Sequence, residues 1–397
     1  MNKFKRVFLI VMDSAGVGHD SDAPKFGDHT NPNTFLHIDE YVNGLKAPTL
    51  EYLGFGDFDN YKYIKKVDHK NSYTTRLHET SNGKDTMTGH WEMMGVNTQK
   101  AFKTFTDTGF PKELLDEITK QTGYELMGNI AASGTEIIKQ MGEEHMKTNK
   151  LIVYTSADSV LQVAAHEEIV PVKKLYEICD KIRQITLKEE WKVGRIIARP
   201  FIGTCANDFT RTPNRHDYAL SPSNKTHLEY LKDAGYDCIS VGKIYDIFNT
   251  SGLTESNRTV SNHHGMEVTT KIAERDFEGI CFVNLVDFDA SYGHRRNPKG
   301  YGEAIEEFDK DVKVLMDKLT DEDLLIITAD HGNDPTAPGT DHTREQVPGV
   351  FYSKAFKEGK YLGVQDTFAV LGATTCDNFD VKFGKDLIGY SLLDQLK

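Results

Sequence analysis

The chain has 397 residues, which is enough for two domains or for one large core with an insertion. Its apolar fraction of 38% and charged fraction of 27% are typical of a folded globular protein and exclude a disordered one. The net charge of −13 argues against general nucleic-acid binding, which needs a basic face. An acidic protein can still bind an anionic substrate, but only through a local cluster of metal ions, arginines and lysines.

The five cysteines are scattered and show no CxxC spacing, so neither a zinc knuckle nor a disulfide framework is expected. The apolar run at 7–12 is too short for the apolar core of a signal peptide, and no run approaches the length of a membrane span. We therefore expect a cytoplasmic protein that does not associate with membranes.

The first predicted element is a strand over 7–12, a β-rich apolar run of the kind found inside parallel sheets. It runs directly into Asp13. A carboxylate at this end of a parallel strand lies where α/β folds place their ligands, although a turn or a helix N-cap also accounts for it. Residues 20–60 are rich in Asp, Asn, Gly and Pro, which predicts surface loops with a short helix.

The stretch GKDTMTGHWE at 83–92 combines small and hydroxyl-bearing residues without periodicity, as in a loop that enters a helix. Thr86 lies where the helix would begin, and its hydroxyl could cap that helix. The unpaired amides and the dipole at a helix start can also hold a phosphate. Taken alone, the stretch leaves both interpretations of Thr86 open.

From about residue 103 the pattern changes to a separate α/β segment. It contains predicted helices over 112–121, 136–141 and 172–187 and predicted strands over 151–155 and 193–198, and it ends near the predicted loop at 210–215. We expect residues 103–220 to fold as an inserted domain. Residues 1–102 and 221–397 would then form one discontinuous core domain.

The core pattern then resumes with alternating elements. Helices are predicted over 226–234, 268–274 and 303–319, and strands over 238–241, 279–286 and 324–328. This alternation predicts an α/β core whose mostly parallel sheet is covered by helices on both faces.

Three predicted core strands end in carboxylates, and histidines follow two of them. The combined set comprises three aspartates and three histidines: Asp13, Asp289, His294, Asp330, His331 and His342. A lone loop histidine is usually polar surface, but six candidate ligands at one sheet edge argue for a metal site. Mixed imidazole and carboxylate ligation suits Mn²⁺ or Zn²⁺ better than Ca²⁺ or Mg²⁺.

Two such ions ~4 Å apart can clamp a phosphoryl group and activate an oxygen nucleophile. A threonine beside them can lose its proton and attack phosphorus. Thr86 thereby becomes a candidate nucleophile rather than only a cap.

Together these segments resemble the alkaline phosphatase superfamily and, within it, the phosphopentomutase family. The resemblance is essentially full length and rests on VMDSAGVG at 11–18, GKDTMTGHWE at 83–92, VDFD at 286–289, YGHRR at 292–296, TADHGNDP at 328–335 and DHTRE at 341–345. The Asp-His-Gly step alone would indicate only the superfamily. The 83–92 stretch together with FTRTPNRH at 209–216 is more specific.

The resemblance implies an alkaline-phosphatase-like three-layer core with a smaller α/β cap inserted in it. It implies an isomerase that interconverts ribose 1-phosphate and ribose 5-phosphate, or their 2-deoxy equivalents, through a phosphothreonine and a bisphosphate intermediate. Two Mn²⁺ ions are implied, with Zn²⁺ or another divalent ion as alternatives. Glucose 1,6-bisphosphate or ribose 1,5-bisphosphate would prime the enzyme.

The resemblance also assigns roles to residues. Thr86 would be phosphorylated, and each cation would have three ligands: Asp13, Asp330 and His331 for one, and Asp289, His294 and His342 for the other. Four residues would bind the substrate: Asp158, Arg195 and Arg211 from the cap and Lys243 from the core. Without the resemblance, the basic residues among them are equally well explained as ordinary surface charge. Small sugar phosphates are the only partners expected, with no nucleic acid, membrane or protein partner.

Four alternatives remain to be weighed. A metal-dependent phosphatase on the same core would release phosphate, although the sizeable insertion argues against it. A metal-dependent phosphoglycerate mutase would be expected to use serine, which Thr86 disfavours, and the Cys-x-Pro-x-Arg setting of a sulfatase is absent. A non-enzymatic scaffold predicts the loss of ligands, yet all six are present.

Overall fold

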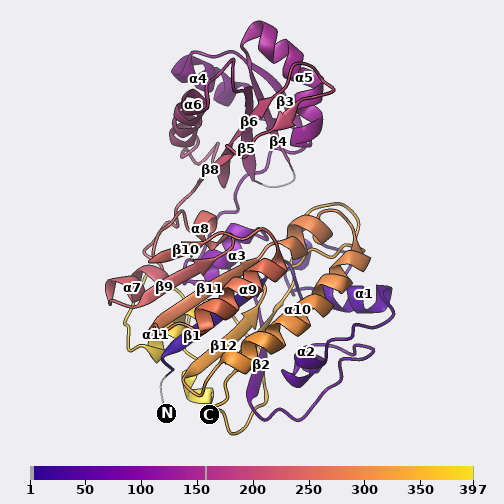
Figure 1. Ribbon diagram of the computed structural model, residues 1–397, viewed down its shortest axis with the longest axis vertical. Coiled ribbons are helices and arrows are strands. Elements are labelled where there is room, and N and C mark those ends of the chain that lie inside the picture. The colour runs from indigo at the N-terminus through magenta and orange to yellow at the C-terminus, as the bar shows by residue number, and fades with distance from the viewer. Residues whose placement is uncertain (1–3, 157–158, 397) are drawn as a thin grey trace. The chain divides into compact units, whose positions relative to one another are not determined.

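A computed structural model describes residues 4–156 and 159–396 (Figure 1). The chain divides into two compact units, a core of 1–101 with 221–397 and a cap of 102–220. The predicted substrate residue Asp158 lies outside the described residues.

The core is built on a sheet that has eight strands within the described residues, in the order β10-β9-β11-β1-β12-β13-β2-β14. The strands are β1 Arg6–Met12, β2 Ser72–Leu77, β9 Asp237–Val241, β10 Glu255–Asn257, β11 Gly279–Leu285, β12 Asp323–Thr328, β13 Val347–Tyr352 and β14 Tyr361–Gln365. The sheet is mostly parallel, as predicted. Only the pairings of β13 with β12 and with β2 are antiparallel.

Helices cover both faces of the core sheet, and Figure 1 shows α9 and α10 along one of them. The core helices are α1 Thr34–Tyr41, α2 Pro48–Tyr52, α3 Thr86–Met93, α7 His227–Asp233, α8 Ile244–Ile247, α9 Asn262–Ala273, α10 Pro298–Lys318 and α11 Val370–Asn378. Helices α1, α2 and α9 each contact α10, whereas α11 contacts α3 and α7, and α3 contacts α8. The core therefore has the three layers that a parallel sheet buried on both faces requires.

The register of the central strands brings their C-terminal ends together. Met12 of β1 pairs with Leu285 of β11, and Val11 pairs with Thr328 of β12. All residues of these three strands are buried, which fixes the register because a slip would move apolar side chains out of the core. The residues that follow each strand therefore meet at one edge of the sheet.

The cap has its own sheet in the order β3-β4-β5-β6-β7, with β8 also paired to β6. Its elements are α4 Lys112–Thr122, β3 Leu126–Ala131, α5 Gly134–Thr148, β4 Leu151–Thr155, β5 Val160–His166, α6 Val172–Ile185, β6 Arg195–Ile202, β7 Thr210–Arg211 and β8 His216–Ala219. Two apolar clusters, one under α4 and α6 and the other under α5, give the cap a hydrophobic core of its own.

Some local predictions were wrong. Residues 20–60 are not only surface loops, because Phe35, Phe55, Phe58 and Tyr61 form a buried aromatic cluster with α1. Strand β11 ends at Leu285 instead of 286. Arg211 lies in the short strand β7, not in a loop. The prediction for 20–60 was wrong because it relied on the many turn-forming residues, whereas the burial of the aromatic residues depends on contacts with distant parts of the chain.

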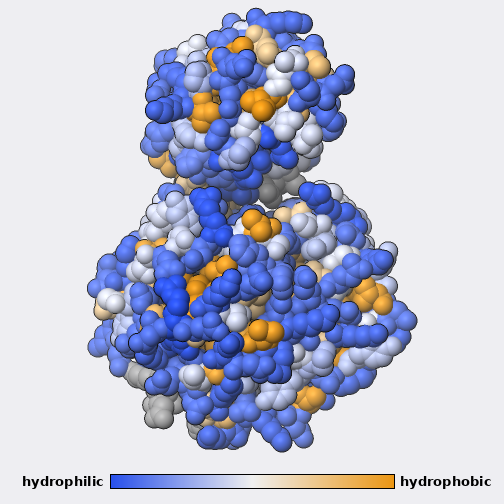
Figure 2. Space-filling model, in the orientation of Figure 1, coloured by the Kyte–Doolittle hydropathy of each residue, from blue (hydrophilic) through white to orange (hydrophobic). Residues whose placement is uncertain are grey.

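On the face of the molecule that Figure 2 shows, hydrophobic residues lie in small separated groups among hydrophilic ones. Among the described residues, no helix has both the length and the apolar character needed to cross a membrane.

Candidate metal centre and phosphate-transfer site

The six predicted ligands, here called the metal centre, gather into two groups at the sheet edge. Asp13, Asp330 and His331 form one group, and Asp289, His294 and His342 form the other. Asp13 follows β1 directly, Asp330 and His331 follow β12, and Asp289 lies in a turn of π-helix at Phe288–Gly293 after β11. All but His294 are at most 6% exposed.

Distances within each group suit a shared cation. In the first group the Nε2 atom of His331 lies 3.3 Å from Asp330 Oδ2 and 3.6 Å from Asp13 Oδ1. In the second, Nε2 of His294 lies 3.1 Å from Asp289 Oδ2 and 3.1 Å from Nε2 of His342. The rings of His331 and His342 stack with their centroids 3.9 Å apart, so the two groups adjoin.

Backbone carbonyls orient all three histidines. The Nδ1 atoms of His294, His331 and His342 lie 2.8–2.9 Å from the carbonyl oxygens of Thr340, Gly332 and Lys84 respectively. A carbonyl can only accept, so each Nδ1 carries a hydrogen, and each Nε2 offers its lone pair to the metal centre once it is deprotonated. Two such lone pairs 3.1 Å apart, on His294 and His342, repel unless a cation lies between them.

Orphaned carboxylate oxygens provide a second test of whether metal ions fit. Asp13 Oδ1 and Asp330 Oδ2 are buried and have no hydrogen-bond partner among the described residues. Buried polar atoms are rarely left without partners, so these oxygens fit a divalent cation. The residues present therefore suit two metal ions, each with carboxylate and imidazole ligands.

In the first group, burial and the neighbouring charges shift the pKa values of all three residues. Burial, together with the carboxylates of Asp330 and Asp289, raises the pKa of Asp13 to about 7. Burial would also raise the pKa of Asp330, but His331 and His90 outweigh it and lower that pKa. Burial disfavours charge on His331, yet Asp330 and Asp13 raise its pKa well above the usual value. Protons thus occupy the site that a cation would take.

Thr86 is the first residue of α3, and its Oγ1 atom lies 3.2 Å from Nε2 of His331. It does not cap the helix. The N-cap is Asp85, whose carboxylate accepts hydrogen bonds from the amides of Met87 and Thr88. Because Asp85 takes the capping role, the hydroxyl of Thr86 can face the metal ligands.

A glycine lets α3 approach the metal centre this closely. A Cβ atom on Gly89 would lie 2.2 Å from the carbonyl oxygen of Asp330, a distance that no side chain tolerates. The buried guanidinium of Arg344 holds the loop before α3, donating to the carbonyls of Ser81 and Gly83. The loop, the helix start and the ligand loops are thus fixed against each other.

The predicted substrate residues divide between the units. Lys243 lies in the core, where β9 meets α8. Arg195 begins β6 and lies 3.7 Å from Asp217, whereas Arg211 lies in β7 and is exposed. Strand register puts Arg195, Arg211, Asp217 and a further residue, Arg199, on the side of the cap sheet that α5 covers.

We call Arg195, Arg199, Arg211, Arg215 and Asp217 the arginine face. Asp217 forms a two-point ion pair with Arg215, with both N–O distances 2.6 Å. Burial and the neighbouring arginines lower the pKa of Arg199 to about 10. The hydroxyl of Tyr154 is buried beside Gly134, the first residue of α5, and has no partner within the described chain. Four arginines around one aspartate leave positive charge for an anion.

Sequence reasoning missed several residues that support the site. Asn333 donates from Nδ2 to Asp289 Oδ1 at 2.7 Å, and Asn284 donates to Asp13 Oδ2 at the same distance. A signal existed for Asn284, since it is the one amide in the apolar run at 280–285. Arg199 carried no motif and is found only through strand register.

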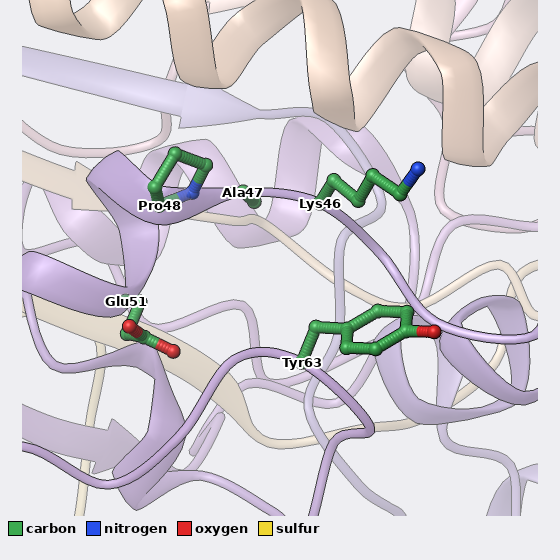
Figure 3. Close-up of a pocket in the computed structure, with 5 residues that line it drawn as sticks. All are labelled: Lys46, Ala47, Pro48, Glu51 and Tyr63. Atoms are coloured by element: carbon green, nitrogen blue, oxygen red, sulfur yellow. The ribbon is translucent and has the colours of Figure 1, made fainter.

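The pocket in Figure 3 is a separate feature of the core, about 290 Å³ in volume. It is lined by Lys46, Ala47, Pro48, Glu51 and Tyr63, and none of the predicted site residues line it. The site is therefore defined by its ligand geometry and not by this pocket.

Comparisons with known proteins show the family of the chain. A model of the Metalloenzyme superfamily matches residues 5–383. Curated phosphopentomutases from Clostridium botulinum and Agathobacter rectalis are 53% and 55% identical over 396 residues, and each alignment covers 100% of both chains. The chain belongs to the phosphopentomutase family. It is therefore an enzyme of the isomerase class, as the resemblance predicted.

A solved structure of the PH0037 protein from Pyrococcus horikoshii shares the fold of this phosphopentomutase family member. It aligns with a TM-score of 0.50 at 14% identity and covers 97% of this chain and 100% of its own. With the three-layer core, this likeness confirms the predicted α/β fold class with its mostly parallel sheet.

Proposed function

We propose that the chain interconverts ribose 1-phosphate and ribose 5-phosphate, and their 2-deoxyribose equivalents. The substrate class rests on relatives that are more than half identical over their whole length. The mechanism rests on one observation, the hydroxyl of Thr86 held 3.2 Å from Nε2 of His331 at the edge of the metal centre.

In this proposal phospho-Thr86 is the resting donor. Its P–Oγ bond breaks as a bond forms between phosphorus and a free hydroxyl oxygen of the sugar monophosphate, which loses its proton. The sugar bisphosphate then reorients in the site, so that its other phosphate faces Thr86. Its other P–O bond breaks, that phosphoryl group returns to Thr86 Oγ, and the released sugar oxygen regains a proton. Glucose 1,6-bisphosphate or ribose 1,5-bisphosphate would phosphorylate Thr86 initially.

Asp13, Asp330 and His331 would hold one Mn²⁺ ion, and Asp289, His294 and His342 would hold the other. Zn²⁺ or another divalent ion suits the same ligands. When bound, these ions supply positive charge that stabilises the oxygens of a transferring phosphoryl group. The chain itself places the Thr86 hydroxyl at the start of α3, 3.2 Å from Nε2 of His331.

Arg195 and Arg211 of the cap and Lys243 of the core would bind the phosphate that is not being transferred. A guanidinium can bind phosphate through two parallel hydrogen bonds, and a lysine acts as a point charge. The positive charge of the arginine face supports this role for the cap. Asp158 keeps its predicted role in substrate binding as part of the proposal. Exclusion of water by the cap would protect phospho-Thr86 from hydrolysis.

An assay that follows two products at once tests the proposal. Purified protein with Mn²⁺ and a trace of glucose 1,6-bisphosphate is given ribose 5-phosphate, and ribose 1-phosphate and free phosphate are followed together. We expect the isomer without matching phosphate release. Release of phosphate without isomer would instead identify a phosphatase, in which water attacks phospho-Thr86.

A further inference from the structure

Two buried polar residues beneath the metal centre have no role in the reaction described above. His90 lies in the second turn of α3 and is 0% exposed, and Asn284 lies in β11 and is 1% exposed. A histidine and an asparagine with so little exposure lose their hydration, so each requires good hydrogen bonds in return.

Their contacts form a continuous chain between a metal ligand and the nucleophile. The Nδ2 atom of Asn284 lies 2.7 Å from Asp13 Oδ2 and 3.2 Å from Nε2 of His90. The Nδ1 atom of His90 then lies 2.8 Å from the carbonyl oxygen of Thr86. The same Nδ1 atom is 3.2 Å from Asp330 Oδ2.

The direction of each hydrogen bond follows from the chemistry of the groups. In the ionised form that ligates a metal ion, Asp13 Oδ2 can only accept, which places the NH₂ group of Asn284 toward it. The second hydrogen of that NH₂ group then points to Nε2 of His90, which must accept. A neutral imidazole with Nε2 accepting carries its hydrogen on Nδ1, and this hydrogen is donated to the carbonyl of Thr86.

This arrangement leaves one polar atom unsatisfied. Asn284 Oδ1 is buried and has no partner within the described residues. Burying an amide oxygen without a donor costs free energy, and a leucine of similar volume would fill this position in the apolar strand without that cost. The cost is explained if the two amide hydrogens of Asn284 are required for the hydrogen bonds to Asp13 and His90.

We propose that Asn284 and His90 are positioning residues that couple the ligand Asp13 to the backbone of the nucleophile Thr86. Asn284 holds Asp13 in the orientation that a metal ion requires, and His90 holds the first turn of α3 relative to it. Loading of the first metal group and alignment of the Thr86 hydroxyl are therefore one event. This inference rests on the proposed role of Thr86.

Single variants test separately the two ends of this hydrogen-bond chain, one at Asp13 and the other at Thr86. In His90→Gln the amide can still accept from Asn284 at the Nε2 position, but the donor to the Thr86 carbonyl is lost. Asn284→Leu removes the donor to Asp13 at similar volume. Asn378→Leu is the matched control, because Asn378 is 1% exposed and, within residues 4–156 and 159–396, its side chain bonds only to the backbone of Phe4, away from the metal ligands.

Two functional readouts are measured on each full-length variant, together with its thermal stability. The first is Mn²⁺ affinity, from the paramagnetic resonance of free Mn²⁺ during titration. The second is the rate of Thr86 phosphorylation by glucose 1,6-bisphosphate at saturating Mn²⁺, from quenched samples and intact-protein mass.

We expect Asn284→Leu to weaken the Asp13-containing metal group by about 10- to 100-fold and to slow phosphorylation as well. His90→Gln should slow phosphorylation by a similar factor at saturating metal. Asn378→Leu should change thermal stability alone. In the double variant, the two effects on phosphorylation should fall short of additive, because both variants break one chain.

The proposal is overturned if both variants bind Mn²⁺ and are phosphorylated at the wild-type rate at saturating metal, or if their effects are additive. It is equally overturned if their defects only follow the loss of thermal stability, as in the control. Failure of the wild-type protein to become phosphorylated at Thr86 would overturn the proposed function instead. The Mn²⁺ titration would still show whether Asn284 supports metal binding by Asp13.

Discussion

In the core, five of the six residues of the metal centre are at most 6% exposed, and backbone carbonyls orient all three histidines. In the cap, the arginine face is more open: the side chains of Arg195 and Arg215 are 23% and 41% exposed, and Asp217 is the carboxylate they share. The core site is held by fixed hydrogen bonds, whereas the cap site consists mainly of charge. Under the proposed function, the reacting groups of the core need fixed geometry, whereas the cap must bind a phosphate and later release it, which suits a more open cluster of charges.

This comparison predicts that core variants reduce turnover and cap variants reduce binding. The largest effect is expected for Thr86→Val, which removes the nucleophilic hydroxyl at nearly constant volume. Isomerase activity should fall by about 10⁴-fold or more, because loss of a nucleophile removes the covalent step. Steady-state assay of ribose 1-phosphate formation measures it. Thr86→Ser is the control and should retain part of the activity; full activity of Thr86→Val would contradict the account.

The two metal groups should fail separately. His331→Ala removes a ligand of the first group and His342→Ala one of the second, and each should lower activity by about 10²- to 10³-fold. Metal analysis after dialysis should find the bound Mn²⁺ reduced by one ion per chain in each. The two groups would not be independent metal sites if one variant lost both ions.

Cap variants should change KM more than kcat. Arg211→Gln removes a charged donor from the arginine face, and a charge-assisted hydrogen bond of ~1.5–3 kcal/mol corresponds to about 10- to 150-fold in KM for the sugar phosphate. Arg199→Gln should act in the same direction. Lys112→Gln is a suitable control because Lys112 lies on the exposed surface of the cap helix α4. A fall in kcat with unchanged KM would contradict the division of roles.

The last effect expected is a pH dependence of Mn²⁺ affinity. The pKa of Asp13 is raised to about 7 and that of His331 is raised well above its usual value, so in the metal-free protein both hold protons near neutrality. Metal binding must displace those protons. Mn²⁺ affinity should therefore rise with pH from 6 through 8, by at most about 10-fold per unit for each proton released.

Calorimetric titration of Mn²⁺ in two buffers of different ionisation enthalpy counts the protons released. His331→Ala should release fewer protons than His342→Ala, since the raised pKa values belong to the first group. Affinity independent of pH over this range would contradict the prediction.

Much of the core followed from the sequence because its strands are continuous apolar runs that end in chemically distinctive residues. Asp13, Asp289 and Asp330 could be placed at one edge because parallel strands in one sheet end together. Strands β2 and β14 were missed because their mixed composition gives no comparable run, and β13 was missed because Pro348 and Gly349 interrupt its apolar sequence. Their pairing depends on neighbours far away in the chain.

The supporting residues of the site could not be predicted in the same way. His90 and Asn284 acquire their roles from contacts that join α3 to β11 across nearly 200 positions, and no local pattern encodes such a contact. Asp85 rather than Thr86 caps α3, although either residue type is a good N-cap. The choice between them is made by the surrounding fold, which directs Thr86 toward His331.

The most direct test of the account follows the phosphoryl group through one turnover. Mn²⁺-loaded protein is phosphorylated with unlabelled glucose 1,6-bisphosphate, freed of excess donor and mixed with ribose 5-phosphate that carries ¹⁸O in its nonbridging phosphate oxygens. We predict that the first ribose 1-phosphate formed is unlabelled and that Thr86 gains the ¹⁸O-labelled phosphoryl group. Labelled ribose 1-phosphate with no label on Thr86 would show direct transfer within the sugar and would contradict the account.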